Sequence, residues 1–328
     1  MLSIEQIDWL GAYQLAPIAT MNFFTTLAAM GKSPFTTKAK TILFDEVKNA
    51  ASQAKILPRN AEFPVGKKDG VKQQAVTPDI IKDSQVFSAA DDIETVPGQV
   101  YLQGKPVSNA DKKRNDRIQK LKTSIEEKRE AVSAEMFFKQ TYTSEDGTVL
   151  NFTKGATASL TAAKGFDAEA RAQETAYQKE NKMYPTHRFI SFDVYDKLVA
   201  IEEAKPNSLS ATTLGAEKIG NQEIQYMLRG GKKYYVLPDA VDCKGNPLTS
   251  TKQLILFNTN ALMPAYAGLA NVVNGKPSME EADVIIRETS ANEKTTAAET
   301  LGESAYVTLP VIPKAIRFCT FDVLANLK

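Results

Sequence analysis

The chain has 328 residues, of which 43% are hydrophobic and 24% charged, and its 40 basic and 39 acidic residues give a formal net charge of +1. This length suits one large domain or two moderate ones, and the composition is that of an ordinary globular protein. The near-neutral charge excludes a dedicated nucleic-acid-binding protein, whose domain would be strongly basic, although a local basic patch stays compatible with it.

Cysteines and apolar runs add further constraints. Cys243 and Cys319 are the only cysteines and form no CxxC pair, so the sequence carries no zinc or redox motif. Two isolated thiols are typical of a chain that folds in a reducing cytoplasm. The longest apolar runs fall short of the ~20 residues that cross a bilayer, and Glu5, Asp8 and Trp9 interrupt the first of them. We therefore expect no membrane span, no signal peptide and a soluble intracellular product.

The first elements in chain order are apolar. Residues 4–30 are rich in aromatic and aliphatic side chains at irregular spacing, and Pro17 interrupts any helix that begins at Ser3. This pattern predicts a short helix followed by an extended arm that some other surface must cover. Residues 33–37 predict a turn, and the Thr-Ile-Leu-Phe run within residues 38–47 predicts a strand.

Residues 55–106 are interrupted throughout by proline and glycine. The interruptions are Pro58, Pro64, Gly66, Gly70, Pro78, Pro97, Gly98, Gly104 and Pro106. Helices do not tolerate this density of breakers, and the alternation of polar and apolar residues is poor. The pattern predicts a long two-stranded hairpin with irregular ends that reaches out from the compact part of the molecule.

A long charged helix is predicted directly after this region, over residues 108–138. Ser108 and Asp111 approximate a capping box, and no glycine or proline follows before Gly147. At 1.5 Å per residue this helix would be about 46 Å long. One apolar stripe runs along it, made of Ile118, Leu121, Ile125, Val132 and Met136. The stripe predicts a helix lying across a sheet, with its other, charged faces solvated or engaged in salt bridges.

The remaining elements are shorter and alternate between helix and strand. A hairpin is predicted over residues 139–153 with its turn at Gly147, then a loop over 155–163 and a helix over 167–182. A strand over 188–193 and a helix over 194–204 follow, the helix ending before Pro206. Further strands are predicted at 224–228, 233–237, 254–257, 305–309 and 315–323. The class is α+β.

A search for catalytic chemistry finds no motif. His187 is the only histidine, and because no GxSxG elbow accompanies it, we predict a structural role. No phosphate-binding glycine loop occurs, and Gly230-Gly231 predicts a hairpin turn with basic edges better than a nucleic-acid-binding RGG tract. Adjacent carboxylates resemble ordinary surface charge; they are Asp91-Asp92, Glu126-Glu127, Glu202-Glu203 and Glu280-Glu281. We predict no catalytic, cofactor-binding or metal-ligating residue and no cofactor.

Six basic residues gather near the start of the long helix. They are Lys112, Lys113, Arg114, Arg117, Lys120 and Lys122. Two interpretations are open: an ordinary solvated helix face, or a surface that meets a polyanion or an acidic neighbour.

Three stretches of the chain resemble one protein family. Residues 23–47 (FFTTLAAMGKSPFTTKAKTILFDEV) resemble its apolar arm, Pro-Phe-Thr-Thr turn and strand. Residues 114–152 are similar to its long helix and following hairpin, and residues 308–325 (TLPVIPKAIRFCTFDVLA) to its two C-terminal strands. The family is the lambda capsid protein E family of bacteriophage major capsid proteins, which have the Hong Kong 97 capsid fold. The order of features covers nearly the whole chain, while residues 207–300 match only in general character.

The resemblance implies a domain organisation. We expect an N-terminal arm over 1–37, a strand and extended loop over 38–107, and a peripheral domain with a spine helix over 108–185. An axial domain would follow over 186–302, and C-terminal strands over 303–328 would return to the peripheral domain.

The resemblance also implies a function. It predicts a structural, non-enzymatic head protein that assembles in the host bacterial cytoplasm into hexamers and pentamers of an icosahedral virion shell around double-stranded DNA. Its partners would be its own copies, a separate scaffold protein, a portal and a decoration protein, with non-specific contacts to DNA and none to a membrane. Three alternatives stay open: an encapsulin-like nanocompartment shell, a tail or baseplate protein, and a hydrolase with an unrecognised site.

Overall fold

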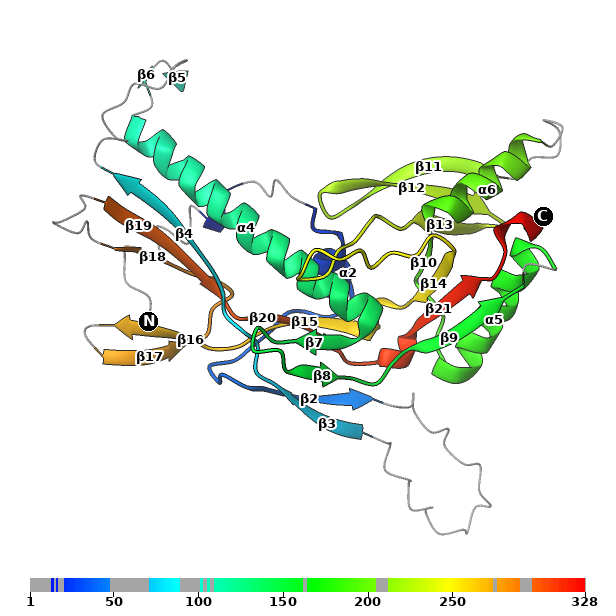
Figure 1. Cartoon of the computed structure of the whole chain (residues 1–328), viewed down its shortest axis with the longest axis horizontal. Helices are drawn as coiled ribbons and strands as arrows, with labels where there is room; N and C mark the ends of the chain where they lie inside the picture. The colour runs from blue at the N-terminus through cyan, green and yellow to red at the C-terminus, as the bar shows by residue number, and fades with distance from the viewer. Residues whose placement is uncertain are drawn as a thin grey trace, which may run out of the picture.

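The computed structural model describes residues 13–14, 16, 21–47, 71–88, 101–102, 105–106, 109–161, 164–204, 212–273, 276–289 and 297–327. They form an elongated α+β molecule with one long helix, α4 (Asn109–Lys139), running through its middle (Figure 1). A seven-stranded sheet lies beyond the C-terminal end of α4, and smaller sheets accompany its length.

Helix α4 confirms the long helix predicted from the sequence. All five members of the predicted apolar stripe are at most 9% exposed. Their spacing returns to one side of a helix that repeats every 3.6 residues. The stripe therefore gives α4 a continuous side against which the other elements pack.

The seven-stranded sheet, which we call the large sheet, combines strands from the middle and the end of the chain. In spatial order they are β11 (Thr213–Ile219), β12 (Gln222–Arg229), β13 (Lys232–Val236), β10 (His187–Ile190), β14 (Gln253–Phe257), β21 (Ile316–Phe321) and β9 (Ala156–Leu160). β10 runs parallel to β13 and β21 parallel to β9, whereas the other neighbours are antiparallel. Helices α5 (Phe166–Asn181) and α6 (Phe192–Glu203) cover one face with an apolar cluster.

The opposite face of the large sheet meets α2 (Phe23–Gly31) and the end of α4 in an aromatic core. The ring centroid of Phe137 lies 5.4 Å from that of Phe257, 6.2 Å from that of Phe189 and 5.3 Å from that of Phe24. Aromatic pairs contribute about 0.5–1.5 kcal/mol each beyond the area they bury. This core therefore fixes the C-terminal end of α4 to the large sheet.

Smaller sheets hold the rest of the described chain. One joins β18 (Ile285–Thr289), β19 (Ala297–Ser304) and β4 (Ile81–Ser88); another joins β1 (Phe35–Thr36), β15 (Leu262–Tyr266) and β20 (Tyr306–Pro310). The two-stranded pairs are β2 (Ile42–Val47) with β3 (Val71–Val76), β5 (Tyr101–Leu102) with β6 (Lys105–Pro106), β7 (Thr141–Thr143) with β8 (Val149–Asn151), and β16 (Leu269–Val273) with β17 (Lys276–Glu280). Short 3-10 helices are η1 (Thr259–Ala261), η2 (Pro313–Ala315) and η3 (Leu324–Asn326).

Most of the predicted elements after α4 are confirmed. The β7–β8 hairpin turns at Gly147, whose φ of 85° is one that glycine adopts easily. Gly230 and Gly231, with φ of 57° and 73°, form the predicted two-residue turn between β12 and β13. The two predicted C-terminal strands are β20 and β21, which join different sheets.

Three local predictions are wrong, because tertiary contacts decide these conformations. The predicted extended arm contains helix α2, whose Phe23 and Phe24 are buried within the same chain. Part of the predicted turn at residues 33–37 is strand β1, which pairs parallel with β15. The predicted loop over 155–163 contains β9, an edge strand beside β21.

The hairpin predicted within residues 55–106 begins earlier in the chain. β3 pairs with β2, so the strand predicted at 38–47 is itself one arm of the hairpin. β4 pairs with β19 instead, more than two hundred positions along the chain. Ser108, residues 48–70 and residues 89–100 lie outside the described residues.

Gly302 on β19 marks the closest approach of that strand to α4. A Cβ atom there would lie 2.7 Å from Leu121 Cδ2 and 3.0 Å from Ile125 Cδ1. We expect Gly302→Ala to lower the free energy of unfolding by about 1–3 kcal/mol, measured by urea denaturation. The added methyl group would press on Leu121 and Ile125, whose side chains are fully buried. Leu121→Ala in the same chain frees space, so the double variant should lose less than the sum of the single losses. Simply additive losses would contradict this packing.

Candidate functional site

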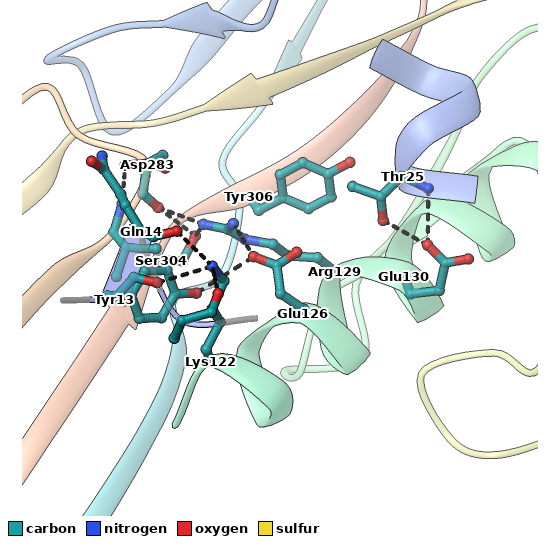
Figure 2. A network of polar contacts seen from close by, with 12 residues as sticks. Tyr13, Gln14, Thr25, Lys122, Glu126, Arg129, Glu130, Asp283, Ser304 and Tyr306 are labelled. Carbon is teal, nitrogen blue, oxygen red and sulfur yellow. Dashed lines mark hydrogen bonds and ion pairs between the residues drawn. The ribbon is translucent and has the colours of Figure 1, made fainter. Parts of the chain in front are cut away.

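Buried charges along α4 are the most unusual chemical feature of the described residues. Five side chains are at most 8% exposed: Lys122, Glu126, Arg129, Glu130 and Glu135. The sequence predicted charged faces that are solvated or engaged in salt bridges; on this side of the helix the charges are buried, and Arg129 forms such a bridge with Glu126. A buried charge is costly unless hydrogen bonds and partners compensate it. Lys122 and Glu126 reach the segment around Tyr13, Arg129 reaches Asp283 and Ser304, and Glu130 reaches Thr25, so these side chains join distant parts of the chain to α4 (Figure 2).

Arg129 forms the centre of this cluster. Its Nη1 donates to Glu126 Oε1 at 2.8 Å, and its Nη2 donates to the Asp283 carbonyl at 2.8 Å and to Ser304 Oγ at 2.7 Å. The guanidinium also lies 5.6 Å from the centroid of the Tyr306 ring, a favourable cation–π distance. Arg129 thus fixes the ends of β18 and β19 against α4 (Figure 2).

Lys122 binds the N-terminal segment through backbone carbonyls. Its Nζ donates to the carbonyl oxygens of Tyr13 at 2.9 Å, Gln14 at 3.2 Å and Ala16 at 2.6 Å. Tyr13 and Gln14 are helical, so the cation lies where unpaired carbonyls at the end of a helical turn favour positive charge. Burial lowers the pKa of Lys122. The lysine predicted as part of an exposed basic cluster is therefore an internal clamp.

Glu130 caps the N-terminus of α2. Its Oε1 accepts from the Phe24 amide at 2.7 Å, and its Oε2 accepts from the Thr25 amide at 2.9 Å and from Thr25 Oγ1 at 2.7 Å. The N-cap residue Asn22 makes no capping bond of its own. The first amides of a helix lack intrahelical partners and favour a negative group. Burial raises the pKa of Glu130 above its usual value, although these hydrogen bonds oppose the rise.

The base of the β2–β3 hairpin is fixed by two further carboxylates. Glu46, fully buried, accepts from the Thr153 amide at 3.1 Å and from Thr153 Oγ1 at 2.7 Å. Asp79, just after β3, accepts from Tyr142 Oη at 3.1 Å and from Ser144 Oγ at 2.9 Å. Both anchors belong to the β7–β8 region that follows α4. These hydrogen bonds therefore hold the β2–β3 hairpin firmly against the β7–β8 region.

The outward face of this hairpin carries apolar surface. Leu43 of β2 is 62% exposed, and its neighbour across the pair is Ala75 of β3. Ile42 and Phe44 point to the other, buried face. Alternation along a strand explains this division. The exposed face is available to another molecule.

His187, the only histidine, lies among aromatic side chains. Its ring stacks on Phe189 with centroids 5.9 Å apart, and its Nδ1 lies 3.0 Å from Thr186 Oγ1. Burial lowers its pKa, so the neutral ring predominates near neutral pH. Among the described side chains, no serine or cysteine is hydrogen-bonded to it. The surroundings are those of a packed core residue.

The other charged residues singled out in the sequence lie in different surroundings in the structure. Glu126 is buried against Arg129 while the adjacent Glu127 is exposed, and Glu202 pairs with Arg229 at 3.1 Å. Asp91-Asp92 lie outside the described residues. In the basic cluster Lys120 is exposed, whereas Lys122 is buried. Whether the cluster's exposed part meets a polyanion or an acidic neighbour stays a prediction.

Two searches of the described residues gave nothing. No three His, Cys, Asp or Glu side chains there lie close enough together to hold a metal ion. Nor does any helix in these ranges combine the length and the apolar character needed to cross a membrane.

Comparison with known proteins assigns the family. The family model described as phage major capsid protein E matches residues 20–263, from just before α2 into β15. The chain belongs to the phage major capsid protein E family. No curated protein matches the sequence.

Comparison with solved structures shows which fold this capsid protein has. A protein described as the capsid protein of a prophage in E. coli CFT073 matches with a TM-score of 0.56 and 11% identity over 98% of this chain and 100% of that one. The capsid protein of cyanophage P-SCSP1u matches with 0.48 and 11%, over 94% and 90%. The SrpI encapsulin of Synechococcus elongatus matches with 0.47 and 12%, over 97% and 95%. The first of these shows the shared fold, and the other two, below 0.5, support no argument.

The family and the fold agree with the resemblance seen in the sequence. The predicted Hong Kong 97-type capsid fold is confirmed. This capsid protein is a structural head protein of the virion shell and not an enzyme. Its functional site is accordingly the set of surfaces and joints that let copies assemble. Sequence reasoning found the long helix, but it paired the strands of the hairpin wrongly and missed the buried clamps on α4.

The Glu130 cap can be tested directly. We expect Glu130→Gln to lower the free energy of unfolding at neutral pH by about 0.5–2 kcal/mol, because glutamine has a single acceptor oxygen and its NH2 group cannot accept from the other backbone amide. Glu127→Gln, on the exposed side of the same turn, is the matched control and should change little. Both are measured by urea denaturation.

The pH dependence of this variant follows from the raised pKa of Glu130. The folded state holds the proton more tightly than the unfolded chain, so the native carboxyl is most favourable below its unfolded-state pKa and loses stability as the pH rises through its folded-state pKa. The stability advantage of the native protein over Glu130→Gln should therefore shrink as the pH rises from the ordinary pKa of a glutamate through the raised folded-state pKa. An advantage that grows as the pH rises through this range would contradict the assignment.

Proposed function

We propose that this capsid protein builds the icosahedral head of a tailed bacteriophage, as hexamers and pentamers that enclose double-stranded DNA. The observation that carries the proposal is the family match over residues 20–263. It favours a phage head over an encapsulin-like nanocompartment and over a tail or baseplate protein. Assembly in the cytoplasm of the bacterial host is part of the proposal.

The described surfaces support a shell subunit. The near-neutral charge of +1 lets many copies lie side by side without strong repulsion. The rigidly based β2–β3 hairpin presents exposed Leu43 on the side that its own chain leaves uncovered. Apolar area of this kind is what association needs in order to offset the lost freedom of the partners. Closed rings of five and six require such surfaces to meet heterologously.

The domain organisation expected from the sequence belongs to this proposal. We assign residues 1–37 to an arm, 38–107 to a strand and overlapping loop, 108–185 to a peripheral domain, 186–302 to an axial domain and 303–328 to C-terminal strands. The proposed partners are further copies of the chain, a separate scaffold protein, a portal and a decoration protein. Packaged DNA would be contacted without sequence specificity.

Electron microscopy tests the proposal. The protein, co-expressed with a scaffold protein of the same phage, should form closed spheres of uniform diameter. Tubes, flat sheets or small rings as the main product would contradict a head protein and favour a tail or baseplate role. A cargo enzyme enclosed in place of DNA would favour the nanocompartment.

The loop between β2 and β3 provides a sharper prediction. Val47 and Val71 are paired, so an Asn-Gly turn can replace residues 48–70 and close the hairpin. We expect this variant to unfold at nearly the same urea concentration as the native protein, as variants with surface substitutions usually do. Electron microscopy should show no stable shells. A second variant replaces residues 48–70 with a Gly/Ser segment of equal length. Shells from both variants would contradict a role for this loop in assembly, and shells from the second alone would mean that only its length matters.

A further inference from the structure

The connection between β13 and β14, residues 237–252, extends from the large sheet and crosses α4 (Figure 1). Both of its ends are fixed to the large sheet. The Leu237 amide donates to the Ile190 carbonyl at 2.8 Å, and Ser191 Oγ donates to the Thr251 carbonyl at 2.7 Å. Its far end, residues 241–246, which we call the tip, rests on α4. The connection thus links two parts of the molecule that otherwise meet in the aromatic core.

The tip holds its shape by itself. Asp242 Oδ1 accepts from the amides of Lys244 at 2.9 Å and Asn246 at 2.8 Å, and the Asp242 amide donates to the Asn246 carbonyl at 2.8 Å. Gly245, with a φ of 82°, makes the turn. An aspartate bonded to its own following backbone in this way stabilises a turn without outside help. The tip can therefore move as a unit.

Three side chains of α4 hold the tip. Lys139 Nζ lies 2.9 Å from Asp242 Oδ2, Lys128 Nζ donates to the Cys243 carbonyl at 3.3 Å, and Glu135 is hydrogen-bonded to the Cys243 side chain. The Lys139 side chain is 42% exposed and that of Lys128 37%, so water competes for both lysines, whereas the Asp242 side chain is 6% exposed. The two lysine contacts are therefore the ones that water can replace while the tip and α4 stay folded.

Hollows lie on both sides of the tip. One, of about 540 Å³, is lined by Cys243, Lys128 and Tyr142 among others; the second, of about 420 Å³, by Val241 and Phe24 among others. Both reach Ala131 on α4. Hollows of this size that open to the surface hold water rather than side chains. Side-chain packing from these two directions therefore adds little to the polar contacts with α4.

We propose that the tip is a latch between the large sheet and α4. Closed, it fixes the angle between them; released, it lets the angle change about the aromatic core around Phe137, while the tip keeps its own fold. The relevance to shells rests on the proposed function, because a subunit that enters both five-fold and six-fold rings meets its neighbours at more than one angle. The latch itself exists in the single subunit.

The two native cysteines provide the readout. Cys243 belongs to the tip and is partly buried, whereas Cys319 of β21 is fully buried in the large sheet. Burial raises the pKa of both thiols to about 11, so neither reacts readily in the closed, folded protein. Release of the latch exposes Cys243 alone, while unfolding of the sheet exposes Cys319 as well.

The experiment measures modification of each cysteine by iodoacetamide under native conditions, with mass spectrometry of the two peptides. Lys139→Met should speed modification of Cys243 about two- to fivefold, the effect of losing one partly screened ion pair, and leave Cys319 unchanged. Lys244→Met is the control. It also removes one positive charge, here from the tip, without removing a contact to α4, and it should leave the rate of Cys243 modification unchanged. Lys139→Arg should restore the native rate.

Two results would overturn the latch. One is that native Cys243 and Cys319 react at the same rate, since both would then report global unfolding. The other is that Lys139→Met leaves the Cys243 rate unchanged. Neither result depends on assembly, so failure to form any shell would count against the proposed function alone. Where shells form, those of Lys139→Met should vary more in diameter; an unchanged distribution would overturn the role of the latch in setting the angle.

Discussion

The fold depends on charged side chains of α4 that are satisfied by backbone groups rather than by opposite charges. Lys122 meets three carbonyl oxygens of the N-terminal segment, and Glu130 meets two amides at the start of α2. Each charge has the sign that its backbone partners require. A lysine or glutamate can therefore remain charged inside the protein, and in doing so it fixes a segment that is about a hundred positions away in the sequence.

This arrangement leaves the outer surfaces free for assembly. The buried side of α4 carries the joints between segments, while Leu43 and Ala75 on the outer face of the β2–β3 hairpin are exposed. Glu46 and Asp79 extend the same principle to the hairpin, because carboxylates accept from backbone amides and hydroxyls of the β7–β8 region. A head protein has to present such surfaces at a defined distance and angle from each other, and a single long helix with internal joints provides this.

The sequence predicted correctly those elements whose conformation depends mainly on residues close by in the chain. The apolar stripe of α4 and the glycine turns at Gly147 and Gly230-Gly231 are examples. Helix α2 and strand β9 were missed because a capping carboxylate and a parallel neighbour, both distant in sequence, determine them. The buried charges did leave a signal. Lys122, Glu126 and Arg129 lie at helical spacing directly beside the stripe, which widens it to the roughly 100° that a core-facing helix shows.

The C-terminal end of α4 shows why the joint to the large sheet can act as a pivot. Gln140 ends the helix in the left-handed region, with a φ of 51°, which costs a non-glycine residue about 1–2 kcal/mol. Three contacts offset that cost: its carbonyl accepts from the Phe152 amide at 3.1 Å, its Oε1 accepts from the Gly155 amide, and its Nε2 donates to the Pro313 carbonyl at 3.2 Å. These partners lead into β9 and β21. The end of α4 is thus bound to the segments that lead into two neighbouring strands of the large sheet, which makes it the fixed point about which the proposed change of angle occurs.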